Sequence, residues 1–334
     1  MKNIVGIDIG GMSLKAGRIP LNYFSHEDII ANKDLKLEDS LVINTYPQLS
    51  SQDFIDINIK AINKLKNDET IAIGIGSPGP LDIHKGVILE SANLPLLKDV
   101  ELITQLKKYY SLDNFTNHIF LQNDANCAAL GQDYFGLGNK YQTYAVITLG
   151  TGIGGGLIFE KKLFNGFNGN GFEVGHTPGD FKSVLGDLPM FQCGCGNYGC
   201  LETIASTKGI LNYFHHLSKN YFPKIQDVQT LYELLSHNDE LTSAYIKAAF
   251  DLASMALGKL TATLIQTLNI DAIIFTGGIS HAQEFLQPQI ESFAQKNSFQ
   301  QLYDRTKVIF TQGNENMGIL GAGALAFSKM EKIY

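Results

Sequence analysis

The chain has 334 residues, of which 44% are hydrophobic and 18% are charged, so it is long enough for two domains with buried cores. Its formal net charge of −7 argues against a nucleic-acid partner, which requires a basic surface. We expect no apolar run that approaches the length of a bilayer, and no signal peptide, because the first residues lead directly into a strand. These features predict a cytoplasmic protein with no membrane partner.

The opening stretch, NIVGIDIGGMSLKAGRI, predicts a strand, a glycine turn and a second strand. Asp8 lies at the tip of the first strand, where Gly10 and Gly11 let the backbone approach a ligand closely. A carboxylate beside such a turn suits a hydrated Mg²⁺ ion, which binds one or two carboxylates together with phosphate oxygens. The same residues also fit an ordinary hairpin with a surface aspartate.

Apolar residues at helical spacing predict a helix over 53–68, and residues 70–82 read as a buried strand that ends in a rigid turn. Residues 118–132 predict a short strand, the pair Asn123-Asp124 and an alanine-rich helix. On spacing alone, Asp124 is favoured as the N-cap of that helix. A carboxylate at the C-terminal end of a strand is also well placed to accept a proton from a bound hydroxyl. Both roles remain open.

Residues 144–160 repeat the design of the opening stretch, a strand, a glycine turn and a strand. Residues 150–155 match G-x-G-x-x-G, but a strand rather than a helix follows, which disfavours a nicotinamide site. We expect the backbone N–H groups of this turn to close on phosphate, with Thr151 offering its hydroxyl. Two such hairpins predict two related lobes that clamp one polyphosphate.

Three of the four cysteines lie close together as C-x-C-x4-C, at Cys193, Cys195 and Cys200, and His176 precedes them. Three thiolates and an imidazole are the ligands of a tetrahedral zinc site, and a site filled by protein reads as structural. Unrelated buried cysteines are the first alternative. A disulfide is the second, although it leaves one of the three unpaired.

Two carboxylates flank the predicted zinc site, Glu173 on one side and Glu202 on the other. A metal there would hold them close together as ligands for a sugar. The hypothesis implies that loss of the metal weakens sugar binding much more than ATP binding.

The last third of the chain predicts buried helices over 241–268 and a buried strand over 269–280. That strand ends at Gly277-Gly278, a close-approach turn where a nucleotide base or ribose could rest. A glycine- and alanine-rich helix over 317–327 is expected to pack closely on its neighbours.

In this order the motifs resemble those of the ROK family (repressor, open reading frame, kinase) over nearly the whole chain. GIDIGG and LGTGIGGG are similar to its two phosphate motifs, NDAN to its catalytic motif and FEVGH to its sugar motif. CGCGNYGCLE and FTGGIS are similar to its zinc and adenosine motifs. The resemblance implies an α/β, two-lobed actin-like ATPase (ribonuclease H-like) fold with nucleotide and sugar in the interdomain cleft. We expect a smaller lobe of 1–117 plus about 312–334 and a larger lobe of 118–311.

The resemblance also implies an ATP-dependent kinase that acts on the 6-hydroxyl of a hexose, with Mg²⁺ and structural Zn²⁺. Asp124 is then the general base, and Asp8 the carboxylate on the magnesium side. The implied sugar contacts are Asn93, Asn123, Asp124, Glu173, His176 and Glu202. The implied nucleotide contacts are Asp8, Gly10, Gly11, Ser13, Lys15, Gly150, Thr151, Gly152, Gly277 and Gly278. The implied zinc ligands are His176, Cys193, Cys195 and Cys200.

Glucose is the expected substrate because two glutamates can accept hydrogen bonds from several hydroxyls, and because it is the commonest substrate in the family. Kinases for N-acetylmannosamine, N-acetylglucosamine, fructose or allose are the alternatives. The resemblance implies ATP as the donor, and the sequence leaves polyphosphate open as an alternative donor. A sugar-binding protein without catalysis is a further alternative. A repressor is disfavoured because the first phosphate motif leaves no room ahead of it for a DNA-binding domain. We expect a homodimer or homotetramer.

Two features depart from the family pattern. Met12 stands where the first phosphate motif usually has threonine, so that Ser13 would have to supply a hydroxyl. The loop 177–192 also looks longer than usual, which bears on sugar access or on a subunit contact.

Overall fold

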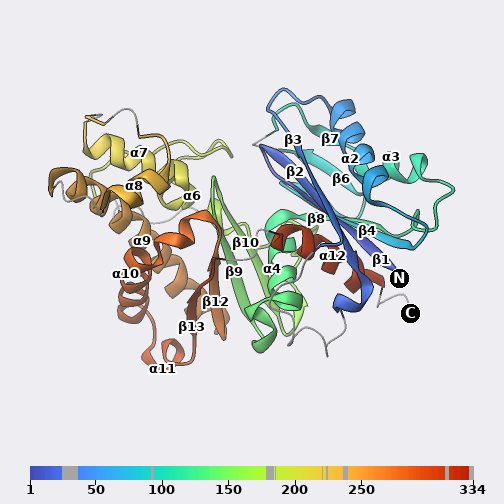
Figure 1. Ribbon diagram of the computed structural model, residues 1–334. Coiled ribbons are helices and arrows are strands. Elements are labelled where there is room, and N and C mark those ends of the chain that lie inside the picture. Colours follow the sequence, from blue (N-terminus) through green and yellow to red (C-terminus); the bar gives the residue numbers. More distant parts are fainter. Residues whose placement is uncertain are drawn as a thin grey trace. The chain divides into compact units, whose positions relative to one another are not determined.

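The computed structural model describes residues 1–24, 37–91, 94–177, 184, 186–219, 221–222, 225–235, 240–312 and 316–330. The chain is a mixed α/β protein, as expected, and it divides into two compact units (Figure 1). Unit 1 comprises Met1–Lys140, Gly156–Phe172 and Asn314–Tyr334, and unit 2 comprises Tyr141–Gly155 and Glu173–Gly313.

Unit 1 is built on a mixed five-stranded sheet. Its order is β3 (Asp39–Asn44), β2 (Ser13–Pro20), β1 (Asn3–Ile9), β4 (Thr70–Ser77) and β8 (Ile119–Asn123). β1, β2 and β3 pair antiparallel, whereas β1, β4 and β8 pair parallel. The predicted opening hairpin is therefore confirmed as β1 and β2. A separate three-stranded sheet is formed by residues between β4 and β8, namely β5 (Leu81–Asp82), β6 (Val87–Glu90) and β7 (Lys98–Val100).

The helices of unit 1 form where the sequence pattern and caps favour them. They are η1 (Leu21–Phe24), α2 (Ser51–Leu65), α3 (Leu102–Tyr109), α4 (Asp124–Phe135), η2 (Leu137–Lys140) and α12 (Met317–Met330). Ser50 caps α2 by accepting the backbone N–H of Asp53, and the helix buries Phe54 and Ile62 against the sheet core. α2 thus confirms the helix predicted over 53–68.

The division into units differs from the expected boundary after residue 117. β8 pairs with β4 in parallel, so residues 119–123 complete the sheet of unit 1. α4 follows directly and packs against α12. Hydrogen bonding and helix packing, which sequence patterns do not display, therefore extend unit 1 to Lys140.

A second sheet has the order β11 (Lys162–Leu163), β10 (Ile153–Phe159), β9 (Tyr144–Leu149), β12 (Ala272–Thr276) and β13 (Lys307–Phe310). β9, β12 and β13 pair parallel, and β12 is buried along its whole length. The repeat of the hairpin design predicted over 144–160 is confirmed as β9 and β10.

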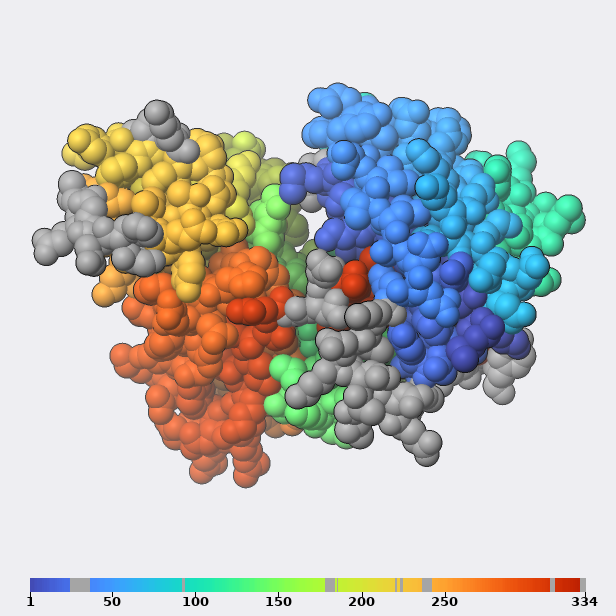
Figure 2. Space-filling view, viewed as in Figure 1, coloured from blue at the N-terminus to red at the C-terminus, as the bar shows by residue number. Residues whose placement is uncertain are grey.

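The described helices of unit 2 are η3 (Val174–His176), α6 (Glu202–Ala205), α7 (Thr207–Leu217), α8 (Val228–Leu234), α9 (Glu240–Leu268), η5 (Gly278–Ala282), α10 (Gln283–Lys296) and α11 (Gln300–Tyr303). They pack on one another and, through α10 and η5, on β9, β12 and β13. α9 contacts α6, α7, α8 and α10, and the space-filling view shows the yellow and orange segments packed against each other (Figure 2).

α9 is a single helix, and its stretch Thr242–Leu268 is long and apolar enough to cross a membrane by length and composition. The expectation that no apolar run approaches that length is therefore wrong. In the structure 67% of the most apolar window is buried, which is typical of the core helix of a folded domain.

α12 approaches the sheet of unit 1 closely enough for its backbone to contact the strands, in addition to the packing of its side chains. A Cβ at Gly74 in β4 would overlap the carbonyl oxygen of Ala322, and a Cβ at Gly6 in β1 would overlap that of Ile319. Residues 319–326 of α12 are all buried. The prediction that a Gly- and Ala-rich helix packs closely is confirmed.

We predict that Gly74→Ala lowers the free energy of unfolding of unit 1 by about 1–3 kcal/mol or more, because neither backbone can move aside easily. Gly323→Ala is the matched control: its methyl group on α12 would meet side chains, the end of Ile19 and the ring of Phe24, rather than backbone, and should cost much less. Thermal and denaturant unfolding of both variants measure the difference. Equal losses would contradict the proposed backbone contact.

Candidate functional site

The first glycine turn is closed by its own backbone and braced by β3. The N–H of Gly10 donates to the carbonyl of Ser13 at 2.8 Å. Thr45, just after β3, donates its hydroxyl to the carbonyl of Gly10 at 3.0 Å and its N–H to that of Met12 at 2.9 Å. Thr45 is buried, so these bonds hold the turn in one conformation. The sequence showed no sign of this role, because it depends on the pairing of β3 with β2.

Asp8 lies at the end of β1, opposite Lys15 on β2. Burial raises the pKa of the Asp8 carboxyl above its ordinary value, and the charge of Lys15 opposes this shift. Gly318 at the start of α12 leaves the room that the carboxylate occupies, since a Cβ there would overlap it. Asp8 is therefore held by β1, β2 and α12 at once.

Asn123, not Asp124, is the N-cap of α4. Its side-chain oxygen accepts the N–H groups of Ala125 at 2.9 Å and Asn126 at 3.2 Å. Asp124 is the first residue of the helix, and its Oδ1 accepts the N–H of Ala125 at 2.8 Å. The sequence-based preference for Asp124 as the cap was wrong. Both residue types make good caps, and only the helix boundary distinguishes them.

The two candidate site aspartates of unit 1, Asp8 and Asp124, lie near one buried thiol. Cys127, one turn into α4, has a pKa well above its usual range, first because it is buried and then because of the charges of Asp8 and Asp124. A Cβ on Gly76 in β4 would lie 3.1 Å from its sulfur. The structure thus brings the proposed magnesium-side carboxylate and the proposed general base to the same end of the sheet.

The second glycine turn lies in unit 2 and joins β9 to β10. The N–H of Gly150 donates to the carbonyl of Gly152 at 3.0 Å, and the N–H of Thr207 donates to the carbonyl of Gly150 at 2.9 Å. Gly277 follows β12 with φ of 104°, and a Cβ there would overlap the carbonyl of Leu149. The proposed phosphate and adenosine turns therefore lie against each other, as the order of β9 and β12 requires.

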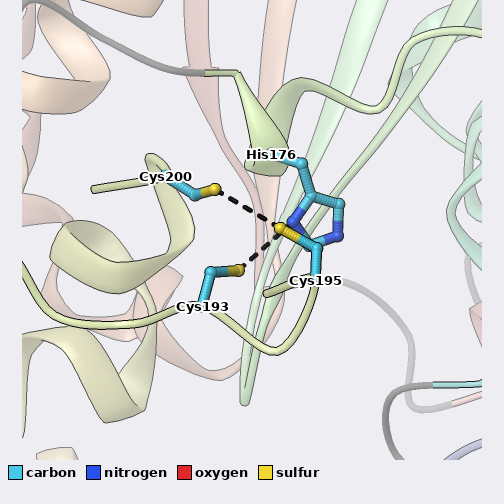
Figure 3. A group of neighbouring side chains, drawn as sticks. All are labelled: His176, Cys193, Cys195 and Cys200. Atoms are coloured by element: carbon cyan, nitrogen blue, oxygen red, sulfur yellow. Dashed lines mark hydrogen bonds between the residues drawn. The ribbon is translucent and has the colours of Figure 1, made fainter. Parts of the chain in front are cut away.

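Four ligand atoms gather in the stretch 176–200 of unit 2. His176, Cys193, Cys195 and Cys200 place one ligand atom each within 4.8 Å of all the others. Figure 3 shows the sulfurs and one imidazole nitrogen turned toward a common centre. The Sγ of Cys193 lies 3.4 Å from Nδ1 of His176, and the sulfurs of Cys195 and Cys200 are 3.6 Å apart.

These distances fit a tetrahedral metal site. Bonds of about 2.0–2.3 Å to nitrogen and sulfur give tetrahedral edges of about 3.6–3.8 Å. A disulfide needs sulfurs at about 2.05 Å, and all four cysteines of the chain are free. Gly196 and Gly199 have φ of 91° and 70°, a conformation that glycine adopts at little cost and that lets the short loop return on itself. Burial raises the pKa of the Cys200 thiol to about 11, and a bound cation would reverse that shift.

Glu173 and Glu202 are close enough to interact. The pKa of the Glu173 carboxyl is raised, first by burial, while the charge of His176 lowers it and that of Glu202 raises it further. Glu202 begins α6, and its Oε2 accepts the N–H of Ile153 at 3.0 Å. The sequence did not reveal this bond to the second glycine turn, since 49 residues separate its partners.

The expected site residues fall into two groups. Unit 1 contains Asp8, Gly10, Gly11, Ser13, Lys15, Asn123 and Asp124. Unit 2 contains Gly150, Thr151, Gly152, Glu173, His176, the three clustered cysteines, Glu202, Gly277 and Gly278. Asn93 lies outside the described residues, as do 178–183 and 185 of the loop 177–192.

A sequence model of the ROK family matches residues 5–329. The chain belongs to the ROK family. Two glucokinases, from Thermotoga maritima and Halalkalibacterium halodurans, are 28% and 30% identical to it; each match covers 96% of the chain and 96% or 94% of the relative. An N-acetyl-D-glucosamine kinase of Pasteurella multocida is 26% identical, with 97% of the chain and 99% of the relative covered.

The crystal structure of a ROK family glucokinase from Streptomyces griseus, in complex with glucose and AMPPNP, superposes with a TM-score of 0.75 at 23% identity. The match covers 98% of the chain and 99% of that structure. The expected fold class, the actin-like ATPase fold of ROK kinases, is confirmed.

In this ROK chain the residue that departs from the first phosphate motif plays no part in packing. The side chain of Met12 is 77% exposed, and only its carbonyl is used, as the acceptor for Thr45. The substitution therefore changes what the turn offers to a ligand and leaves the turn itself in place.

We predict that Asp8→Asn raises the melting temperature of the ligand-free protein at neutral pH. The pKa of Asp8 is raised on folding, so the folded state binds this proton more tightly than the unfolded state does. Ionisation of the Asp8 carboxyl therefore lowers the free energy of unfolding. The loss grows as the pH rises from the ordinary pKa of an aspartate, about 3.9, through the raised pKa of Asp8 in the folded protein. Below about pH 3 the two proteins should melt alike.

Asp82→Asn is the control, because the pKa of Asp82 is shifted in the opposite direction to that of Asp8. Hydrogen bonding from the backbone N–H of Lys85 is the largest cause of the lowered pKa of Asp82, so its carboxylate favours folding at neutral pH. That variant should show no gain in melting temperature. A lower melting temperature of Asp8→Asn than of the wild type at pH 7 would contradict the burial argument.

Proposed function

We propose that this ROK chain is an ATP-dependent glucokinase that phosphorylates the 6-hydroxyl of glucose. The observation that carries the proposal is the arrangement at the start of α4. Asn123 caps the helix there, and Asp124 holds its carboxylate where β8 ends. The two glucokinases that match the chain almost end to end support the choice of reaction and of sugar.

Asp124 is assigned the role of general base. As the 6-hydroxyl oxygen attacks the γ-phosphorus, Asp124 accepts the hydroxyl proton, the new O–P bond forms, and the bond to the β-phosphate oxygen breaks to release ADP. The positive end of α4 favours the ionised form of a carboxylate in its first turn. Asn123 adjoins the base and is assigned to orient the sugar.

The two glycine turns are assigned to the nucleotide. Phosphoryl transfer passes through a loose transition state, so positioning and neutralisation of charge supply most of the catalysis. Backbone N–H groups of Gly11–Ser13 and Thr151–Gly152 are the fixed dipoles assigned to that purpose, because the N–H groups of Gly10 and Gly150 donate within their own turns. Asp8 and its surroundings suit Mg²⁺, which when bound would neutralise charge on the phosphates. Lys15, across the hairpin from Asp8, adds a positive charge, and Gly277-Gly278 form the wall for adenosine.

The sugar is assigned to Asn93 and to the carboxylates of unit 2, with His176. Glu173 and Glu202 interact electrostatically and both can accept hydrogen bonds from ring hydroxyls. His176 presents Nδ1 to the sulfurs, which leaves Nε2 as the nitrogen for the sugar. N-acetylglucosamine, N-acetylmannosamine and fructose are the alternative substrates, and the N-acetyl-D-glucosamine kinase relative favours the first of these. A panel of sugars assayed for ADP release, with ATP or polyphosphate as donor, tests the assignment.

The Cys/His cluster is assigned to structural zinc, because its four ligand atoms fit a tetrahedron and leave no position open for catalysis. We further propose a cytoplasmic enzyme, in keeping with reduced thiols, that acts as a homodimer or homotetramer.

We predict that Asp124→Asn lowers kcat at least about a hundredfold, the low end for loss of a general base, without loss of the fold. Asp133→Asn makes the same substitution on the same helix, and it should keep kcat within about twofold, as expected of a residue remote from the proton transfer. Coupled ADP-release kinetics with glucose measure both. Near-normal turnover of Asp124→Asn would show that this residue is structural.

We predict about one zinc ion per chain in the purified protein, and its loss in Cys195→Ser. Cys127→Ser is the control, since Cys127 lies in α4 of unit 1 and should not change the metal content. Elemental analysis of the three proteins decides the matter. A wild type that is active and free of metal would overturn the zinc assignment.

A further inference from the structure

The carboxylate of Glu202 contacts two parts of unit 2, the second glycine turn and the Cys/His cluster, which belong to different sequence motifs. Its Oε2 accepts the N–H of Ile153 at 3.0 Å, and its Oε1 lies 3.4 Å from the Sγ of Cys193. Ile153 is the first residue after the turn Gly150–Gly152, and Cys193 belongs to the Cys/His cluster. One side chain thus spans the distance from a metal ligand to a phosphate turn.

A glycine in the turn leaves the room that this carboxylate occupies. A Cβ at Gly152 would overlap Oε2 of Glu202, so a larger residue at that position would force this carboxylate to move. A Cβ at Gly175, which precedes His176 directly, would overlap the carbonyl of Ile153. The N–H and the carbonyl of Ile153 are therefore both enclosed by the stretch that carries the metal ligands.

Hydrogen bonds accepted by carboxylates are in general shorter and stronger than those between neutral groups. Ile153 opens β10, so fixing its N–H also fixes the angle at which the turn enters the strand. The N–H groups of Thr151 and Gly152, which are assigned to phosphate, are directed by that same angle.

We propose that Glu202 is a positioning residue that couples the Cys/His cluster to the second glycine turn, so that occupancy of the metal site sets the affinity for nucleotide phosphate. The proposal rests on the assignment of this turn to nucleotide. It differs from the hypothesis that loss of the metal weakens sugar binding much more than ATP binding, because the side chain of Glu202 reaches the turn itself.

The test uses the full-length protein without turnover. Binding of AMPPNP in the absence of sugar is measured by calorimetry, and hydrogen exchange is measured in peptides that cover residues 144–159. Glu202→Ala should weaken AMPPNP about tenfold and speed exchange at 150–154 about tenfold, while about one zinc per chain is retained. Glu202→Gln keeps an oxygen that can accept from Ile153, so it should restore most of the protection.

Glu291→Ala is the matched control. It removes a carboxylate on α10 of unit 2 that accepts from the side chain of Gln287, so AMPPNP affinity and exchange at 150–154 should equal those of the wild type. A wild-type sample stripped of metal by a chelator should behave like Glu202→Ala, and reloading with zinc should reverse the change.

The proposed coupling would be overturned if Glu202→Ala, or the metal-free wild type, bound AMPPNP and exchanged hydrogen at 150–154 as the untreated wild type does. Glu202 would then be a sugar ligand only. Failure of the proposed function is a separate result: the wild type would then phosphorylate no sugar in the panel, while exchange at 150–154 still responded to Glu202 and to zinc.

Discussion

Backbone contact between α12 and the sheet of unit 1 is the constraint on which the proposed catalytic end of that unit depends. Helix and strand approach until the carbonyls of Ile319 and Ala322 meet Gly6 and Gly74, a separation that no larger residue permits. The same approach brings Gly318 against the carboxylate of Asp8. A wider spacing would leave that carboxylate in water, with an ordinary pKa and freedom to rotate. Close packing and the electrostatics of Asp8 are therefore one property of the fold.

Among the described residues between η3 and α6, those that carry the three clustered cysteines form turns and an isolated bridge between Gln192 and Tyr198. A four-ligand metal site, as proposed for His176 and these cysteines, would add a local constraint to such turns. The carboxylates that flank the site, Glu173 and Glu202, would then share a fixed frame, which their electrostatic interaction requires.

Local patterns predicted most of the site, and non-local pairing accounts for what they missed. Both glycine hairpins, the cysteine cluster and the strand before Asp124 are written in short runs of sequence, and the structure contains each of them. Thr45 was missed because its role exists only once β3 pairs with β2. The bond from Ile153 to Glu202 joins residues from different elements, so no spacing rule could reveal it. The cap of α4 was misassigned for a different reason, since adjacent Asn and Asp compete for it on equal terms.

The first glycine turn keeps its conformation whatever side chain stands at position 12, where this chain has methionine. The first glycine turn is closed by Gly10 and Ser13 and braced by Thr45, and all of these bonds use backbone atoms of the turn. Side chains at position 12 are therefore free to vary without moving the turn, and the methionine there projects into solvent. A threonine hydroxyl lost at this point would remove one donor to the phosphate that we propose the turn binds, while the backbone N–H groups keep their directions. Because those groups are the fixed dipoles proposed to stabilise developing charge, we expect the departure from the family motif to change nucleotide affinity more than the phosphoryl-transfer step.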